Sequence, residues 1–102
     1  MSRQTVYPHL AVNDWVRRID DQHFGVAASF SRACEALADI DLTSCGAIIQ
    51  SDRCRLYNYV PLRAMPGAFR MILMFDIEGP YVNILSVAIP TLTLSYHAPA
   101  IR

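Results

Sequence analysis

Residues 69–89, FRMILMFDIEGPYVNILSVAI, decide the fold of this chain. Side chains two residues apart share one face of a β-strand, so the alternation within Phe69–Ile77 separates two sets of side chains. We expect one set, Phe69, Met71, Leu73 and Phe75, to face a core, and the other, Arg70, Ile72, Met74 and Asp76, to face away from it. Glu78-Gly79-Pro80 has the composition of a turn, and Tyr81–Ile89 is typical of a second strand. The stretch therefore predicts an antiparallel hairpin.

Working upstream, Leu56–Leu62 is rich in tyrosine and aliphatic residues, and Met65-Pro66-Gly67 marks a turn before Phe69. The three runs together predict an antiparallel meander. Three weaker segments flank it. Ala47–Ile49 is compatible with a short strand, Thr5–Val12 with an edge strand or an extended lead-in around Pro8, and the residues beyond Pro90 with a final edge strand or a tail.

The first half of the chain has helical spacing. Asn13 is an N-cap candidate for a short helix over Asp14–Ile19, and Asp20 or Asp21 is a candidate cap for a longer second helix. In that second helix apolar residues recur at steps of three and four, which predicts a buried face of Phe24, Ala27, Phe30, Cys34 and Leu37. The pattern indicates a helical hairpin.

The length of 102 residues suits one domain, residues 1–102, with a single core. Hydrophobic residues make up 53% of the chain, enough to fold and to leave apolar surface for a partner to cover. We expect the α+β class, with an N-terminal helical hairpin packed on a small antiparallel β-sheet.

Composition and missing motifs argue against several classes of protein, namely disulfide-bonded, membrane-spanning, metal-binding and cofactor-binding ones. Three cysteines, Cys34, Cys45 and Cys54, lack CxxC spacing and are expected to be reduced thiols. No apolar run approaches the ~20 residues of a membrane span and the first residues lack an export signal, so we expect a cytoplasmic protein. The sequence contains no phosphate-binding loop, zinc motif or nucleophile elbow, and therefore predicts neither a cofactor nor a metal.

The charges are balanced overall, with nine arginines against nine acidic residues, but they are unevenly distributed. From Arg53 to Arg70 there are four arginines and no acid. On the predicted strands Arg63 shares its face with Tyr57 and Tyr59, a combination suited to phosphate contact and base stacking. The ordinary alternative is an exposed or salt-bridged arginine beside half-buried strand tyrosines.

Candidate acid and base groups are few. Tyr96 and His97 are the residues near the end of the chain with side chains suited to proton transfer. Arg70 is expected on the strand face turned away from the core, where a guanidinium needs solvent or an anion.

Two stretches resemble the RelE/ParE superfamily of bacterial toxins, especially its HigB-like members. Residues 7–40, YPHLAVNDWVRRIDDQHFGVAASFSRACEALADI, are similar to the family's opening, a short tryptophan-bearing helix before a longer one. Residues 55–87, RLYNYVPLRAMPGAFRMILMFDIEGPYVNILSV, are similar to its central signature, a strand ending in Leu-Arg, a variable turn and an aromatic-Arg-hydrophobic strand.

The resemblance implies a toxin held by a cognate antitoxin, which enters the ribosomal A site and cleaves mRNA without a metal. Arg63 and Arg70 match the family's phosphate-binding, catalytic arginines, Tyr96 its terminal tyrosine, and Tyr57 and Tyr59 would join the RNA contact. Two features depart from the pattern: Pro61 stands before Leu62-Arg63 where many members have glutamate, and residues 87–92 carry no charge.

The departures leave three functions open. The first is a ribosome-dependent endoribonuclease toxin, active or decayed. The second is a ParE-like inhibitor of DNA gyrase that cleaves nothing, and the third is a non-enzymatic protein-interaction module, because one fold can support all three.

Overall fold

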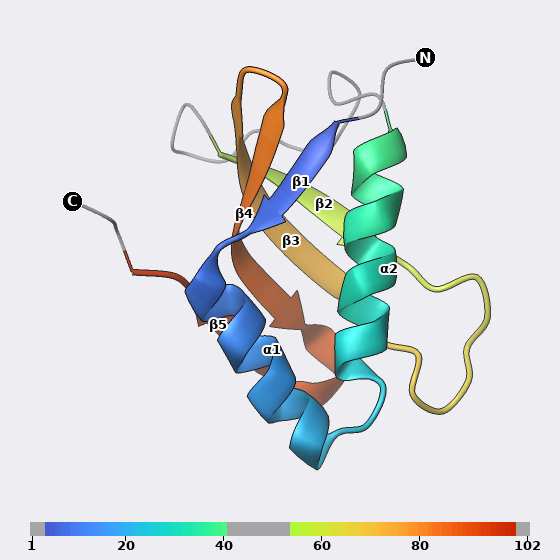
Figure 1. Ribbon diagram of the computed structural model, residues 1–102. Helices are drawn as coiled ribbons and strands as arrows, with labels where there is room; N and C mark the ends of the chain where they lie inside the picture. The colour runs from blue at the N-terminus through green and yellow to red at the C-terminus, as the bar shows by residue number, and fades with distance from the viewer. Residues whose placement is uncertain (1–3, 41–53, 100–102) are drawn as a thin grey trace.

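The computed structural model describes residues 4–40 and 54–99 (Figure 1). Two helices cover one face of a five-stranded mixed sheet, as expected for the α+β class. The elements in chain order are β1 (Thr5–Pro8), α1 (Leu10–Gln22), α2 (Val26–Asp39), β2 (Cys54–Tyr59), β3 (Met71–Glu78), β4 (Tyr81–Ile89), the 3₁₀ turn η2 (Pro90–Leu92) and β5 (Leu94–His97). The sheet order is β1-β4-β3-β2, and β5 pairs with β4.

The predicted meander is confirmed, since β3 pairs antiparallel with β2 on one side and with β4 on the other. Leu73 lies opposite Tyr57 of β2 and opposite Val87 of β4. The bounds of β2 differ from expectation, because the strand ends at Tyr59 and not at Leu62. Proline has no backbone N–H to donate, so Pro61 cannot extend the ladder.

Two short strands share the other edge of β4. Strand β1 runs parallel to its first half, with Thr5 opposite Tyr81, and β5 runs antiparallel to its second half, with Tyr96 opposite Val87. Between them the pairing of β3 with β4 is irregular, because Met74 faces Ser86 while Phe75 faces Ile84. The residues beyond Pro90 thus form an edge strand, and the Thr5–Val12 segment divides into a strand and the start of a helix.

The helix starts differ from the predicted caps. His9, not Asn13, caps α1, because its Nδ1 atom accepts a hydrogen bond from the Ala11 N–H at 3.0 Å. The N-cap position of α2 is Gly25 and not Asp20 or Asp21, but the Asp20 side chain caps this helix from within α1. Its Oδ1 atom accepts from the N–H groups of Gly25 and Ala27 at 3.1 and 3.0 Å, which satisfies orphan donors at the start of α2.

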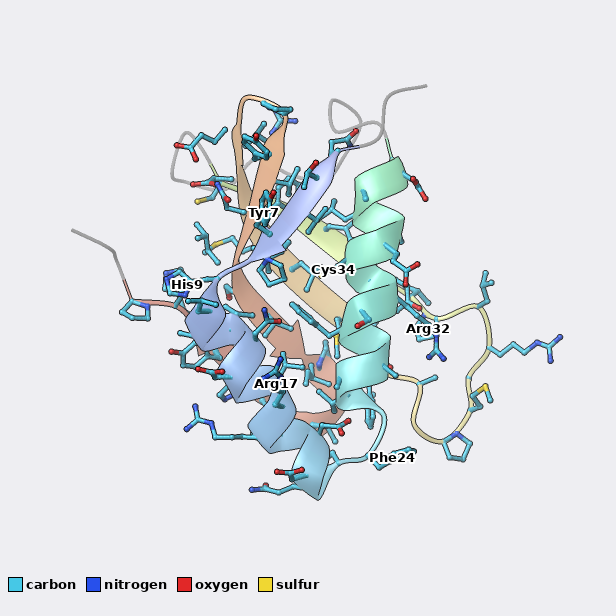
Figure 2. The ribbon with its side chains drawn as sticks, viewed as in Figure 1. Tyr7, His9, Arg17, Phe24, Arg32 and Cys34 are labelled. Carbon is cyan, nitrogen blue, oxygen red and sulfur yellow. The ribbon has the colours of Figure 1, made fainter. Side chains whose placement is uncertain are left out.

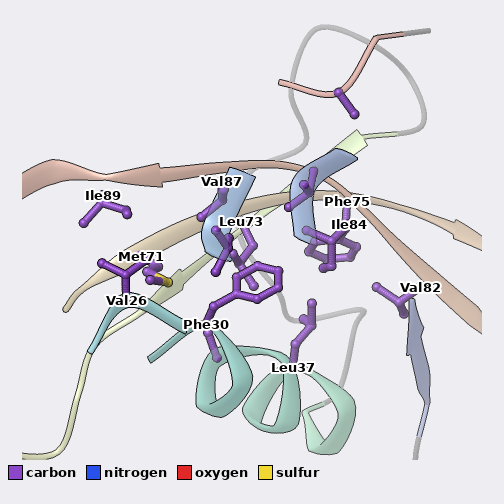
Figure 3. Close-up of a cluster of buried hydrophobic side chains, with 14 residues drawn as sticks. Val26, Phe30, Leu37, Met71, Leu73, Phe75, Val82, Ile84, Val87 and Ile89 are labelled. Carbon is purple, nitrogen blue, oxygen red and sulfur yellow. The ribbon is translucent and has the colours of Figure 1, made fainter. Parts of the chain in front are cut away.

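The core lies between α2, α1 and the sheet (Figure 3). Phe30 and Leu37 of α2 point toward Leu73, Phe75 and Ile84 of the sheet. The buried hydrophobic residues are Val12, Val16, Val26, Phe30, Ala33, Leu37, Ala38, Met71, Leu73, Phe75, Val82, Ile84, Val87, Ile89 and Ala98. The expected alternation of β3 is therefore confirmed, with Phe69 partly buried against this core.

Phe24 is the clear error in the predicted core, because 87% of its surface is exposed. It precedes α2, which begins at Val26, so the helical period that was applied to it does not hold there. The expected Ala47–Ile49 strand lies outside the described residues, as do Cys45 and Arg53. Within residues 4–40 and 54–99, neither helix is long and apolar enough to cross a bilayer.

Candidate functional site

The side of the sheet opposite the helices, here called the outer face, carries Arg70. Asn58 lies opposite Ile72 in the β2–β3 pair, so it turns to the same side as Ile72 and, two residues earlier, Arg70. The Arg70 Nε–H donates to the Asn58 Oδ1 atom at 3.1 Å. This contact orients an exposed guanidinium immediately before the start of the central strand β3.

The charge of Arg70 is not neutralised by the described part of the chain, where it makes no ion pair. Two carboxylates, those of Asp76 and Glu78, lie on the outer face of the same strand, and both accept from Asn83 Nδ2, at 2.9 and 3.5 Å. Asp76 is the nearer of the two to Arg70 along the strand. Six residues of strand separate Asp76 from Arg70, roughly 20 Å at 3.3 Å per residue. At physiological salt the attraction between two charges at that distance is largely screened. Arg70 can therefore bind an external anion.

Tyr57 and Tyr59 lie on the opposite side of β2 from Asn58. They pair with Leu73 and Met71 and pack, partly buried, against the core. The structure therefore does not bring these rings to the face that carries Arg70. Their environment corresponds to the ordinary alternative, half-buried strand tyrosines.

Arg63 does not end a strand as expected, because it lies in the loop that follows β2. It is exposed and lines a pocket of about 260 Å³. The other residues around this pocket are Ser29, Arg32, Tyr59, Pro61, Leu62, Met65 and Ala68. Arg63 and Tyr59 thus line the same pocket beside α2, but they do not share a strand face and neither lies with Arg70.

Tyr96 is on the helix side of the sheet. Its ring stacks on Trp15 of α1, with ring centroids 5.8 Å apart and planes inclined by 19°. It lines an open cleft of about 480 Å³ with Ala11, Asp14, Arg17 and Arg18. The predicted group of Arg63, Arg70 and Tyr96 is therefore spread over three different places.

His97, the other predicted proton-transfer residue, lies on the outer face of the sheet. It pairs with Ser86, which lies opposite Met74, and it is exposed. Counting four residues along the strand and two strands across, His97 is about 16 Å from Arg70. This figure is a separation between backbones, and both side chains are exposed on the same face of the sheet.

Cys34 is not an activated nucleophile. Cys34 and Cys54 are free thiols. Burial, and secondarily the charge of Glu35, raise the pKa of Cys34 to about 12, so its thiol stays protonated at neutral pH. No group of three or more His, Cys, Asp or Glu side chains in the described residues is arranged to hold a metal ion.

Two residues of these sites were missed by the sequence reasoning. Asn58 lies between the tyrosines Tyr57 and Tyr59, and the alternation that turned them inward would have placed it on the outer face with Arg70. Arg32 had no such signal, because its proximity to Arg63 depends on how α2 packs beside the loop.

Comparison with protein-family models, with characterised proteins and with solved structures finds no significant match to this chain. The resemblance to RelE/ParE toxins stays a prediction from the sequence.

Proposed function

We propose that this chain is the toxin of a toxin–antitoxin pair, similar to RelE/ParE proteins, and that its outer face binds RNA. The observation that supports this function is the Arg70–Asn58 pair. It presents an oriented cation, without an acidic neighbour among the described residues, on the side of the sheet that the helices leave open. The proposal includes an antitoxin, the ribosome and mRNA as partners, and a cytoplasmic location.

Arg70 has the chemistry that phosphate binding requires. Its Nε–H is used by Asn58, which leaves the two terminal nitrogens of the guanidinium for a bidentate contact with phosphate oxygens. If the ribose 2′-oxygen attacks the adjacent phosphorus and the bond to the 5′-oxygen breaks, negative charge develops on the phosphoryl oxygens. A guanidinium fixed beside them stabilises that transition state.

The same reaction needs one group to take the 2′-hydroxyl proton and another to protonate the leaving 5′-oxygen. Tyr96, the predicted group for this role, stacks on Trp15 on the helix side. No histidine, tyrosine or carboxylate of the described residues makes a hydrogen bond with Arg70 or Asn58. This arrangement favours a second candidate function, binding without cleavage, either as a ParE-like gyrase inhibitor or as a protein-interaction module.

Two assays test this function. In cells, expression of the chain is induced and the 5′ ends of mRNA are mapped. In vitro, the purified chain is incubated with mRNA, with and without ribosomes. If cleavage depends on Arg70, Arg70→Ala should lower its rate by ~100-fold, equivalent to about 3 kcal/mol of transition-state stabilisation. The melting temperature should change little, because Arg70 is exposed. Arg17→Ala is the matched control, since Arg17 is an exposed arginine on α1 (Figure 2).

Each outcome separates the candidates. Cleavage by wild type that Arg70→Ala retains would show that the site is wrong. Growth inhibition or gyrase inhibition without any cleavage would select binding. Tyr96→Phe removes only the hydroxyl, and we expect it to cleave like wild type because Tyr96 is on the other side of the sheet from Arg70. No effect of the wild-type chain on growth, translation or gyrase would overturn the toxin proposal.

A further inference from the structure

Large apolar side chains are exposed around the loop between β2 and β3. Leu62 is fully exposed, and Val60 and Met65 keep 60% and 58% of their surface in solvent. Phe24 projects from the nearby α1–α2 turn, whose backbone touches the loop at Gly67 (Figure 2). We call these four residues, with Arg32 and Arg63, the loop surface.

The loop is held in place by specific contacts. The buried Ser29 hydroxyl donates to the Gly67 carbonyl at 3.2 Å and accepts from the Phe69 N–H at 3.0 Å. A Cβ atom at Gly25 would lie 2.2 Å from the Gly67 carbonyl oxygen, so the α1–α2 turn and the loop fit together only because glycine is present. The apolar side chains are therefore presented by an anchored backbone, which lowers the entropy cost of binding a partner.

The charge of the loop surface is positive. Arg32 extends from α2 on the side of the loop (Figure 2), and it lines the same pocket as Arg63. None of the described residues around that pocket is acidic, and neither arginine makes an ion pair within the described chain. Aromatic residues, methionine and arginine are the residues enriched at protein interfaces, and acidic residues are depleted there.

We propose that the loop surface binds a segment of a partner polypeptide in which a carboxylate is flanked by large apolar side chains. The carboxylate binds Arg32 and Arg63 through charge-assisted hydrogen bonds, and the apolar side chains cover Phe24, Leu62 and Met65. This interaction goes beyond RNA binding on the outer face, because it uses neither Arg70 nor Asn58.

Two other ligands fit these residues less well. The pocket of about 260 Å³ is smaller than the roughly 300–1,000 Å³ of sites for drug-sized molecules. Nucleic acid would satisfy the two arginines, but its phosphates would leave Val60 and Leu62 in water. A polypeptide can satisfy both the charges and the apolar side chains.

The experiment pans a phage library of random dodecapeptides against the folded protein. We expect enriched peptides to carry aspartate or glutamate beside leucine, phenylalanine, methionine or tryptophan. A synthetic peptide of the consensus sequence, measured by fluorescence anisotropy, should lose about tenfold or more in affinity in the double variant Arg32→Glu/Arg63→Glu and in Leu62→Ser. Arg17→Glu and Arg70→Ala should bind it like wild type.

The proposal fails if no peptide is enriched, if the enriched peptides lack carboxylates, or if the double variant retains binding. It also fails if Leu62→Ser abolishes a concentration-dependent dimer, because the occupant would then be a second copy of the chain. An RNA oligonucleotide bound through Arg32 and Arg63 would equally overturn it. Circular dichroism melting checks that every variant is folded, and the Arg70→Ala result keeps this test separate from that of the RNA-binding face.

Discussion

The two sides of β3 differ sharply within a single strand. Met71, Leu73 and Phe75 are fully buried against the helices, whereas Ile72 and Met74 between them are half-buried, and Arg70, which directly precedes the strand, is exposed. One side therefore supplies packing that holds the fold, and the other carries the groups that we propose contact RNA. Alternate residues of a strand point to opposite faces. A substitution on one face can therefore be compared with a substitution of the neighbouring residue on the other face.

The largest effect on stability is expected when a side chain on the buried side of β3 is truncated. Phe75→Ala should lower the free energy of unfolding by ~3–5 kcal/mol, because it removes a fully buried aromatic ring and leaves a cavity. Met74→Ala, one residue away on the outer face, should cost only about 1 kcal/mol. Chemical denaturation measures both, and equal losses would contradict the division between the faces.

A smaller effect is expected where α2, which covers the buried side of β3, anchors the loop between β2 and β3. Ser29→Ala leaves the Phe69 N–H without its acceptor and should cost ~1–3 kcal/mol. Ser31→Ala is the matched control, because Ser31 is exposed on the same helix, and its change should be within ~0.5 kcal/mol. Hydrogen exchange of the Phe69 amide, faster in Ser29→Ala alone, would identify the lost bond; no difference between the two variants would contradict the anchoring role.

The smallest effect concerns the helix layer above the buried side. Burial raises the pKa of Cys34 from 9.0 to about 12, so above pH 9.0 the unfolded chain releases the thiol proton before the folded chain does. Stability should then fall as pH rises through this window, by at most about 1.4 kcal/mol per pH unit. The decline should be shallower in Cys34→Ala than in wild type when melting is followed between pH 8 and 10. Parallel curves would show that Cys34 is not responsible.

Much of the fold followed from local patterns. The alternation from Phe69 onward identified the buried residues of β3, and the Gly79 turn separated it from β4. The helical hairpin was also predicted, and Asp20, one of the two predicted cap residues, bonds to N–H groups at the start of α2 although Gly25 holds the N-cap position. These succeeded because period and turn chemistry act within a few residues along the chain.

Other predictions failed where contacts distant in sequence decide the outcome. Phe24 had the right spacing for a helix face, but the close fit of Gly25 against Gly67 puts it in the turn before α2. The parallel pairing of β1 with β4 joins residues more than seventy positions apart, such as Thr5 and Tyr81. Neither contact leaves a periodic signal in the sequence.

The candidate site divides in the same way. The sequence by itself determined that Arg70 turns away from the core and that Met71, Leu73 and Phe75 turn toward it, because the pleat of a strand fixes which side chains share a face. Only the tertiary structure decided that Asn58 meets Arg70, that Arg63 joins Arg32, and that Tyr96 stacks on Trp15. Those partners come from different elements, and their meeting depends on strand register and helix packing, which local residue patterns do not encode.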